Sequence, residues 1–184
     1  GKLLALDGGP ANQTDILLLP LPDGRGSEKG TPRPFLQTQH DEQNAAFSPD
    51  GRWMAYTSME SGQAQVYVRP AAAGAGGKWQ VSTDGGRFPR WAAGGRELVY
   101  VLPDRLMAVA IEAGPVFRAG TPKELFRYPF VQIGAGGQAG YDVSADGKRF
   151  VVIQSSADPS AATSEVHFVL EWFEDIRRRV RAGG

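Results

Sequence analysis

Cysteine is absent from the 184-residue sequence, which excludes a disulfide framework and a thiolate metal site. Histidine is limited to His40 and His167, which stand far apart without a third ligand at metal spacing. Twenty basic and twenty acidic residues cancel, so there is no electrostatic argument for a nucleic-acid or anionic-membrane partner. We therefore expect no metal, no cofactor and no nucleic acid.

Long hydrophobic runs are also missing. The longest, Ile16 to Leu21, is interrupted by Pro20 and falls far short of the ~20 apolar residues that cross a bilayer. The chain opens on Gly1-Lys2, with neither Met nor a signal-peptide pattern. We expect a piece of a longer protein, with no direct membrane insertion by this piece and no indication of its compartment.

Catalytic signatures are missing too. The sequence contains no G-x-S-x-G elbow and none of the kinase motifs, such as His-Arg-Asp or Asp-Phe-Gly. We therefore expect this chain not to be an enzyme.

Glycine and proline, by contrast, are plentiful. The 24 glycines and 13 prolines lie between short apolar segments, which is typical of many strands and turns rather than of disorder.

One pattern recurs along the chain: a strand, a four-residue turn ending in glycine, a basic residue and a second strand. The copies are AAFSPDGRWMAYTS from Ala45, PRWAAGGRELVYV from Pro89 and YDVSADGKRFVVIQ from Tyr141. Their terminal glycines are spaced by 44 and then 52 residues. Such a period indicates a repeat architecture.

Further strands follow each copy. Third strands are expected at QVYVRP from Gln65, RLMAVAI from Arg105 and EVHFVLEW from Glu165. Outer strands are expected at KWQVST from Lys78 and KELFRY from Lys123. An incomplete copy precedes them, with LLAL from Leu3, DILLLPL from Asp15 and RPFLQT from Arg33. Four antiparallel strands in about 44 residues are typical of a propeller blade. A meandering sandwich is the alternative, although it requires no fixed period.

The predicted fold is therefore all-β: a partial β-propeller of about two full and two incomplete four-stranded antiparallel blades. The expected segments are an incomplete blade at 1–39, blades at 40–84 and 85–130, an incomplete blade at 131–172 and a short C-terminal helix at 173–181. The helix is favoured by the i,i+4 pairs Glu174–Arg178 and Asp175–Arg179. A nucleic-acid patch at Arg177–Arg181 is the less favoured interpretation of the same segment.

FSPDGRWMAYTS resembles the WD40-like PD40 repeat of TolB, tricorn-type and dipeptidyl-peptidase-type propellers. SMESGQAQVYVRPAAAGAGGKWQVSTDGGRFPRW and the ending VHFVLEWFEDIRRRV are similar to propellers of bacterial, notably acidobacterial, serine/threonine kinases. The resemblance runs from about Asp15 to Val180, with departures at Ala71 and Gly94. It implies a propeller that follows a membrane span, on the extracytoplasmic side, and no reaction of its own.

The turn Ser48-Pro49-Asp50-Gly51 could be a reactive site or only a turn. Proline sets φ, the aspartate can accept a hydrogen bond from an amide two residues on, and glycine takes a positive φ. A catalytic aspartate would also need a partner base or carboxylate. The structural interpretation is favoured because the motif recurs at Asp146-Gly147 and becomes Gly94-Gly95 in the middle copy.

Other motifs have ordinary explanations. GAGGQA at 134–139 fits a dinucleotide pattern, yet a strand follows it rather than a helix, so we expect an insertion between blades. STDGG and SADGK lack the ligands of a calcium loop. Loops remain as candidate interaction surfaces. The candidate interaction residues are Glu60, Ser61, Gly62, Gly134, Gly136 and Gly137.

The strand count predicts an arc with open strand edges, which attract other chains. We expect a protein or peptide partner of unknown identity, and either self-association through the open blade edges or completion by other segments. The leading hypothesis is a non-catalytic interaction or sensing module of a larger bacterial protein, such as a membrane-bound kinase. The alternatives are the gating propeller of a prolyl-oligopeptidase or tricorn-type peptidase and a TolB-like periplasmic interaction protein.

Overall fold

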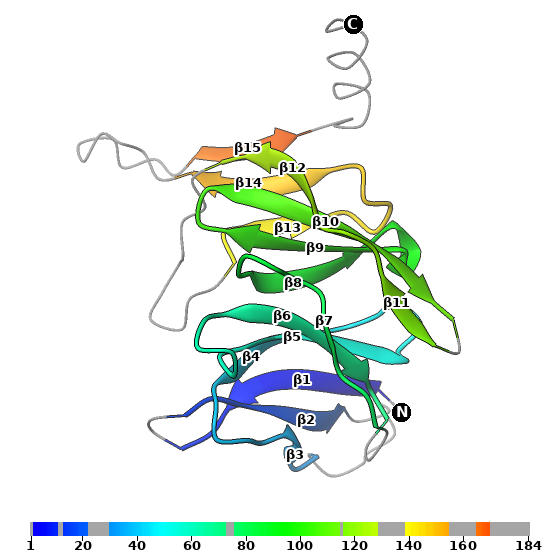
Figure 1. Ribbon diagram of the computed structural model, residues 1–184. Helices are drawn as coiled ribbons and strands as arrows, with labels where there is room; N and C mark the ends of the chain where they lie inside the picture. Colours follow the sequence, from blue (N-terminus) through cyan, green and yellow to red (C-terminus); the bar gives the residue numbers. More distant parts are fainter. Residues whose placement is uncertain are drawn as a thin grey trace, which may run out of the picture. The chain divides into compact units, whose positions relative to one another are not determined.

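The structure, a computed structural model, describes residues 2–10, 13–21, 30–72, 76–114, 116–128, 139–154 and 165–169. Strands make up most of these residues, as the dispersed turn formers predict (Figure 1). The chain divides into two compact units, residues 1–89 and 90–184.

Four antiparallel sheets follow one another along the chain. The first sheet has the order β1-β2-β3: β1 (Lys2–Gly8), β2 (Asp15–Leu21) and β3 (Arg33–Leu36). The second has the order β4-β5-β6-β7: β4 (Glu42–Phe47), β5 (Trp53–Ser58), β6 (Gln65–Pro70) and β7 (Trp79–Gln80).

The third sheet contains five strands, with β10 pairing both β11 and β12. Its strands are β8 (Arg87–Ala92), β9 (Glu97–Leu102), β10 (Arg105–Ala113), β11 (Phe117–Ala119) and β12 (Lys123–Arg127). The fourth has the order β13-β14-β15: β13 (Tyr141–Val143), β14 (Phe150–Gln154) and β15 (Glu165–Val169). Among the described residues, two sheets have all four strands of the repeat and two have three, which confirms the predicted partial set of antiparallel blades.

Two outer strands differ from the sequence prediction. Strand β7 has only two residues, although the amide of Val81 still donates to the carbonyl of Val66 at 2.8 Å. Strand β11 was not predicted: β10 is nine residues long, so its first half pairs with β12 and its second half with β11. The predicted C-terminal helix at 173–181 lies outside the described residues.

The middle turn also departs from the predicted pattern. Residues Ala93–Gly95 form the 3₁₀ turn η1, in which Ala93, Gly94 and Gly95 all have positive φ. This copy lacks the serine and aspartate of the other two turns, so no side chain braces the backbone and the glycines set its path.

Within the first unit, the first and second sheets pack face to face. Ile16 of β2 is fully buried against Tyr56 and Tyr67, whose rings stack with centroids 5.9 Å apart. Phe35 and Leu36 of β3 complete the contact. Burial of this aliphatic and aromatic surface is the main stabilising contribution here.

A hydrogen bond from the first strand of a copy to the preceding sheet accompanies this packing. Asn44 has a φ of 60°, and its amide donates to the Asp7 carboxylate of β1 at 2.9 and 3.0 Å. Forty-four residues later Phe88 has a φ of 56°, and its amide donates to Thr57 Oγ1 of β5 at 3.3 Å. The left-handed residue turns an amide out of the strand ladder and toward the neighbouring sheet.

We predict that Asn44→Ala lowers the free energy of unfolding by about 1 kcal/mol, because an alanine is strained in the left-handed region that asparagine tolerates. Asn44→Gly is the matched control and should stay close to the native value, since both variants keep the amide. Urea denaturation followed by tryptophan fluorescence measures the difference. Equal stability of the alanine and glycine variants would contradict the role of the positive φ.

Candidate functional site

The turn Ser48-Pro49-Asp50-Gly51 is closed by its own side chains. The Ser48 hydroxyl donates to Asp50 Oδ1 at 2.6 Å and accepts from the amide of Trp53 at 2.9 Å. Asp50 Oδ1 also accepts from the amide of Arg52 at 3.1 Å, which is the bond expected two residues on. Gly51 has a φ of 71° and donates its amide to the Ser48 carbonyl at 2.8 Å.

The turn of the fourth sheet repeats this arrangement. The Ser144 hydroxyl donates to Asp146 Oδ1, which also accepts from the amide of Lys148 at 3.0 Å. A Cβ added to Gly147 would lie only 3.2 Å from the amide nitrogen of Ala93, at a φ of 74°. The repeated contacts indicate an architectural turn, and in this copy the turn also packs on η1.

These contacts set the protonation state of the turn aspartates. The Ser48 hydroxyl, helped by the Arg52 side chain and amide, lowers the pKa of Asp50 from 3.8 to about 2. The Ser144 hydroxyl and the Lys148 amide lower the pKa of Asp146. A general acid or base works best with a pKa near the working pH, and both aspartates are displaced away from neutrality.

The predicted interaction residues Glu60, Ser61 and Gly62 lie in the β5–β6 connection. Glu60 is ion-paired with Lys78 at 2.5 Å, and Lys78 Nζ lies 5.2 Å from the centroid of the Tyr67 ring. Ser61 and Gly62 are exposed. The part of this loop free to meet a partner is therefore its tip. Gly134, Gly136 and Gly137 lie outside the described residues.

A buried polar cluster that sequence reasoning missed lies where β2 and β4 begin. Asp15 accepts from Gln13 Nε2 at 3.1 Å and from Gln37 Nε2 at 2.9 Å, and Glu42 Oε1 accepts from Thr38 Oγ1 at 2.5 Å. Both carboxylates are buried, and burial raises the pKa of Glu42.

The next copy uses different residues for the same purpose. Gln65, fifty residues after Asp15 and likewise first in its strand, accepts from the Ser82 hydroxyl and from the amide of Gly85 at 3.2 Å. The only signal in the sequence is that Asp15 and Gln65 are polar residues that both begin a third strand. This recurrence favours a structural role, which is to hold the following inter-sheet connection against the sheet.

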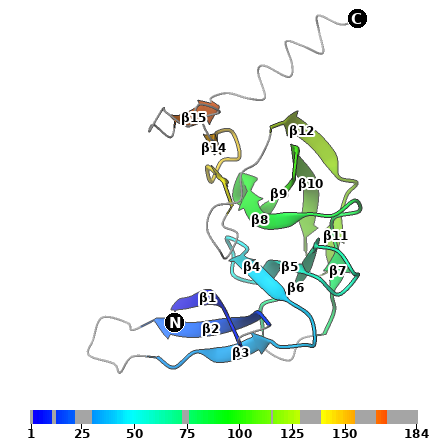
Figure 2. The ribbon, with the colours of Figure 1, turned by 90° about the vertical axis from the view of Figure 1, so that its left-hand side faces the viewer.

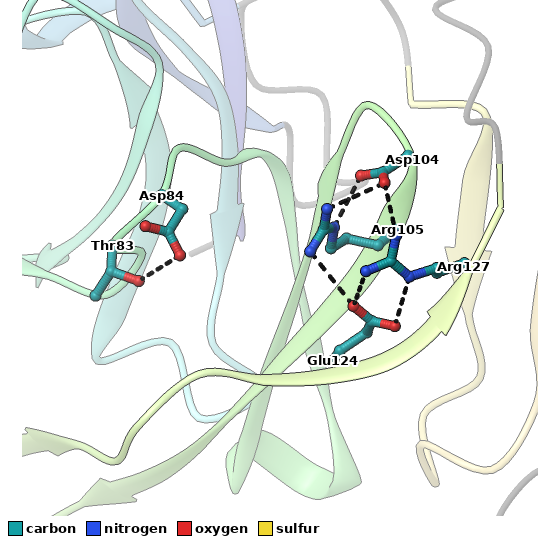
Figure 3. Close-up of polar contacts among 6 residues, drawn as sticks. All are labelled: Thr83, Asp84, Asp104, Arg105, Glu124 and Arg127. Carbon is teal, nitrogen blue, oxygen red and sulfur yellow. Dashed lines mark hydrogen bonds and ion pairs between the residues drawn. The ribbon is translucent and has the colours of Figure 1, made fainter.

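Exposed charges gather at the β9–β10 turn and on β12 (Figure 3). Arg105 pairs with Asp104 at 2.8 Å and with Glu124 at 3.4 Å, while Arg127 pairs with Glu124 at 3.2 Å and with Asp104 at 3.4 Å. The two positive and two negative groups satisfy one another. The network therefore braces the third sheet at its surface and leaves no excess charge for a ligand.

Metal ligands do not converge anywhere in the described ranges: no group of three or more histidine, cysteine, aspartate or glutamate side chains could hold an ion there. His40 lies in the connection between β3 and β4, whereas the side chain of His167 is not described. Across the same ranges there is no helix of the length and apolarity needed to span a membrane.

No family model matches the chain, and no curated protein does either. Solved structures do. The chain is similar to TolB from Agrobacterium tumefaciens, with a TM-score of 0.63 and 16% identity over 94% of this chain and 58% of that one. The chain folds as part of a β-propeller.

A puromycin-hydrolysing peptidase from Mycobacterium tuberculosis is also similar, with a TM-score of 0.51 and 16% identity over 92% of this chain and 28% of the peptidase. The propeller fragment therefore spans about three fifths of the TolB structure and less than a third of the peptidase. Its four sheets are the four blades of that fragment, two of them with three strands among the described residues.

We predict that Asp50→Ala lowers the free energy of unfolding by about 1 kcal/mol at neutral pH, because three hydrogen bonds to the carboxylate are lost. The effect is modest because the Asp50 side chain is 42% exposed and solvent screens its charge. Asp142→Ala, at a 74% exposed side chain, is the control and should be nearly neutral.

The pH dependence of stability tests the Asp50→Ala variant in a second way. The folded pKa of Asp50 lies below its ordinary value of 3.8, so its contribution is complete above that pH and is lost as the pH falls toward 2. The stability difference between the native protein and Asp50→Ala should therefore shrink from pH 5 to pH 2, as measured by urea denaturation at each pH. A difference that stays constant over this interval would contradict the assignment.

Proposed function

We propose that the chain is a non-catalytic propeller module that binds a protein, a peptide or another ligand for a larger bacterial protein. The more specific proposal is the sensor region of a membrane-bound serine/threonine kinase, on the extracytoplasmic side. The similarity of the segments at 58–91 and 166–180 to kinase-associated propellers supports it.

One observation carries the non-catalytic proposal. Asp50, the residue with the most catalyst-like setting in the sequence, has its carboxylate bonded to Ser48 and Arg52 and a pKa of about 2. The same bonds recur around Asp146. The motif thus serves the backbone, and loops on a rigid scaffold remain as the means of recognition.

Two alternative functions are supported by separate observations. A TolB-like interaction protein is supported by the structural likeness to TolB, and a gating propeller by the likeness to a peptidase of which this chain covers 28%. The parent reading frame separates them. A kinase domain and a membrane span before this segment support the sensor, whereas a following α/β-hydrolase domain with a G-x-S-x-G elbow supports the gate.

A displayed library of random peptides tests binding against catalysis directly. We predict that selected peptides bind the protein at the β5–β6 loop and are recovered uncleaved by mass spectrometry. Ser61→Arg, at the exposed tip, should weaken binding by about tenfold, since it alters the shape and charge of the contact surface.

Ala72→Arg is the matched control. Ala72 is also exposed and follows the end of β6 opposite to the β5–β6 loop, so its substitution should leave affinity unchanged. Cleavage of the selected peptides would contradict the non-catalytic proposal. If the native protein, Ser61→Arg and Ala72→Arg bound the selected peptides with equal affinity, the β5–β6 loop would not be the binding surface.

A further inference from the structure

One face of the first sheet carries five leucines from the paired strands β1 and β2. The two strands lie side by side in Figure 2. Directly opposed residues of an antiparallel pair point to the same side of the sheet. Leu4 opposes Leu19, Leu6 opposes Leu17, and Leu21 opposes Lys2. We call these five residues the leucine face: Leu4, Leu6, Leu17, Leu19 and Leu21.

The leucine face is open to solvent. Leu4 is 44% exposed and Leu21 is 38% exposed, and the other three leucines are only partly buried. The opposite face of the same sheet is covered at Ile16, which packs against Tyr56 and Tyr67, whereas Leu3 on that face is 48% exposed. Exposed contiguous apolar patches of this kind mark contact surfaces.

The internal repeat identifies what covers such a face. Fifty residues after Leu4, Leu6 and Leu17 stand Met54, Tyr56 and Tyr67 of the second sheet. Met54 is 0% exposed where Leu4 is 44% exposed. At the equivalent tyrosine positions the cover is the neighbouring sheet, through Ile16 and its companions Phe35 and Leu36. The surface that fits the leucine face is therefore the aliphatic face of another propeller sheet.

The chain itself offers such a face on its fourth sheet. Tyr141 and Val152 oppose each other on one side, and both are buried in the second unit, where the Tyr141 hydroxyl donates to the Val99 carbonyl at 3.2 Å. Val151 and Ile153 alternate with them on the other side and are only partly buried. This second surface, the fourth-sheet outer face, carries Val151 and Ile153 together with Asp142, which opposes Val151. The face that carries Ile16 has a similar composition, since Asp7 opposes Ile16 there.

We propose that the leucine face binds the fourth-sheet outer face of a second copy of this chain. The two surfaces are different, so the contact is heterologous, and copies add head to tail until a ring closes or a short filament forms. This association does not depend on which ligand the module recognises.

The leucine face is distinct from the open strand edge predicted from the sequence. Strand β1 is the edge strand of the first sheet, and another chain could pair with it through backbone hydrogen bonds. Leu19 lies on β2, between β1 and β3, so its side chain projects from the sheet face and takes no part in edge pairing. A substitution at Leu19 therefore separates the two modes.

Sedimentation velocity over a range of concentrations measures the association. The native chain is expected to form species larger than a monomer as concentration rises. Leu19→Glu should weaken the association by about tenfold or more, because it buries a carboxylate in an apolar contact. Val116→Glu is the control and should behave like the native chain, since Val116 is 62% exposed and belongs to neither of the two faces.

A mixing experiment keeps the test valid if one variant is less stable. Leu19→Glu retains the fourth-sheet outer face, and Ile153→Glu retains the leucine face. A heterologous contact therefore predicts that each variant alone associates weakly, whereas a mixture forms a dimer that grows no further. A native chain that stays monomeric at high concentration overturns the proposal. So does a Leu19→Glu variant that associates normally, which would indicate pairing along β1.

Discussion

The structure depends on one constraint: its sheets are apolar on both faces, so each needs a neighbour on either side. The contact of Ile16 with Tyr56 and Tyr67 shows how the need is met within the chain, since one sheet supplies the cover for the next. A lone antiparallel sheet of this kind could not remain stable in water, whereas a succession of them shares its apolar surface. The repeat in the sequence is the consequence of this requirement.

Polar residues serve the same arrangement. The amides of Asn44 and Phe88 donate hydrogen bonds to the preceding sheet. The bond between Ser48 and Asp50 closes the turn that leads into the next strand. Asp15 holds the connection between two sheets. Asp50, which most resembles a catalytic residue in the sequence, therefore accepts hydrogen bonds that hold the backbone of its turn. The surfaces that remain for recognition are the loop tips and the sheet faces that no neighbouring sheet covers.

The sequence predicts the parts of the fold that are local in character. Turn residues such as Asp50 and Gly51, and strands that follow them, leave a pattern that recurs at a fixed period. The left-handed conformation of Asn44 leaves no such pattern in the sequence. Its partner Asp7 is 37 residues away, and the contact forms only when the two sheets pack together. The buried pair Asp15 and Glu42 is hidden for the same reason, since polar residues at strand ends ordinarily face water. The sequence predicts from turn residues alone that Ser61 lies in a loop. It does not predict the ion pair between Glu60 and Lys78.

Carbene footprinting of the dilute, monomeric chain tests the central claim most directly, because the label reports which side chains meet solvent. Met54 and Leu4 occupy equivalent positions of successive blades, one covered and one open. The account predicts heavy labelling at Leu4 and Leu21 and very little at Met54 and Tyr56. Comparable labelling of Leu4 and Tyr56 would contradict it, because it would mean that the first sheet does not cover the second.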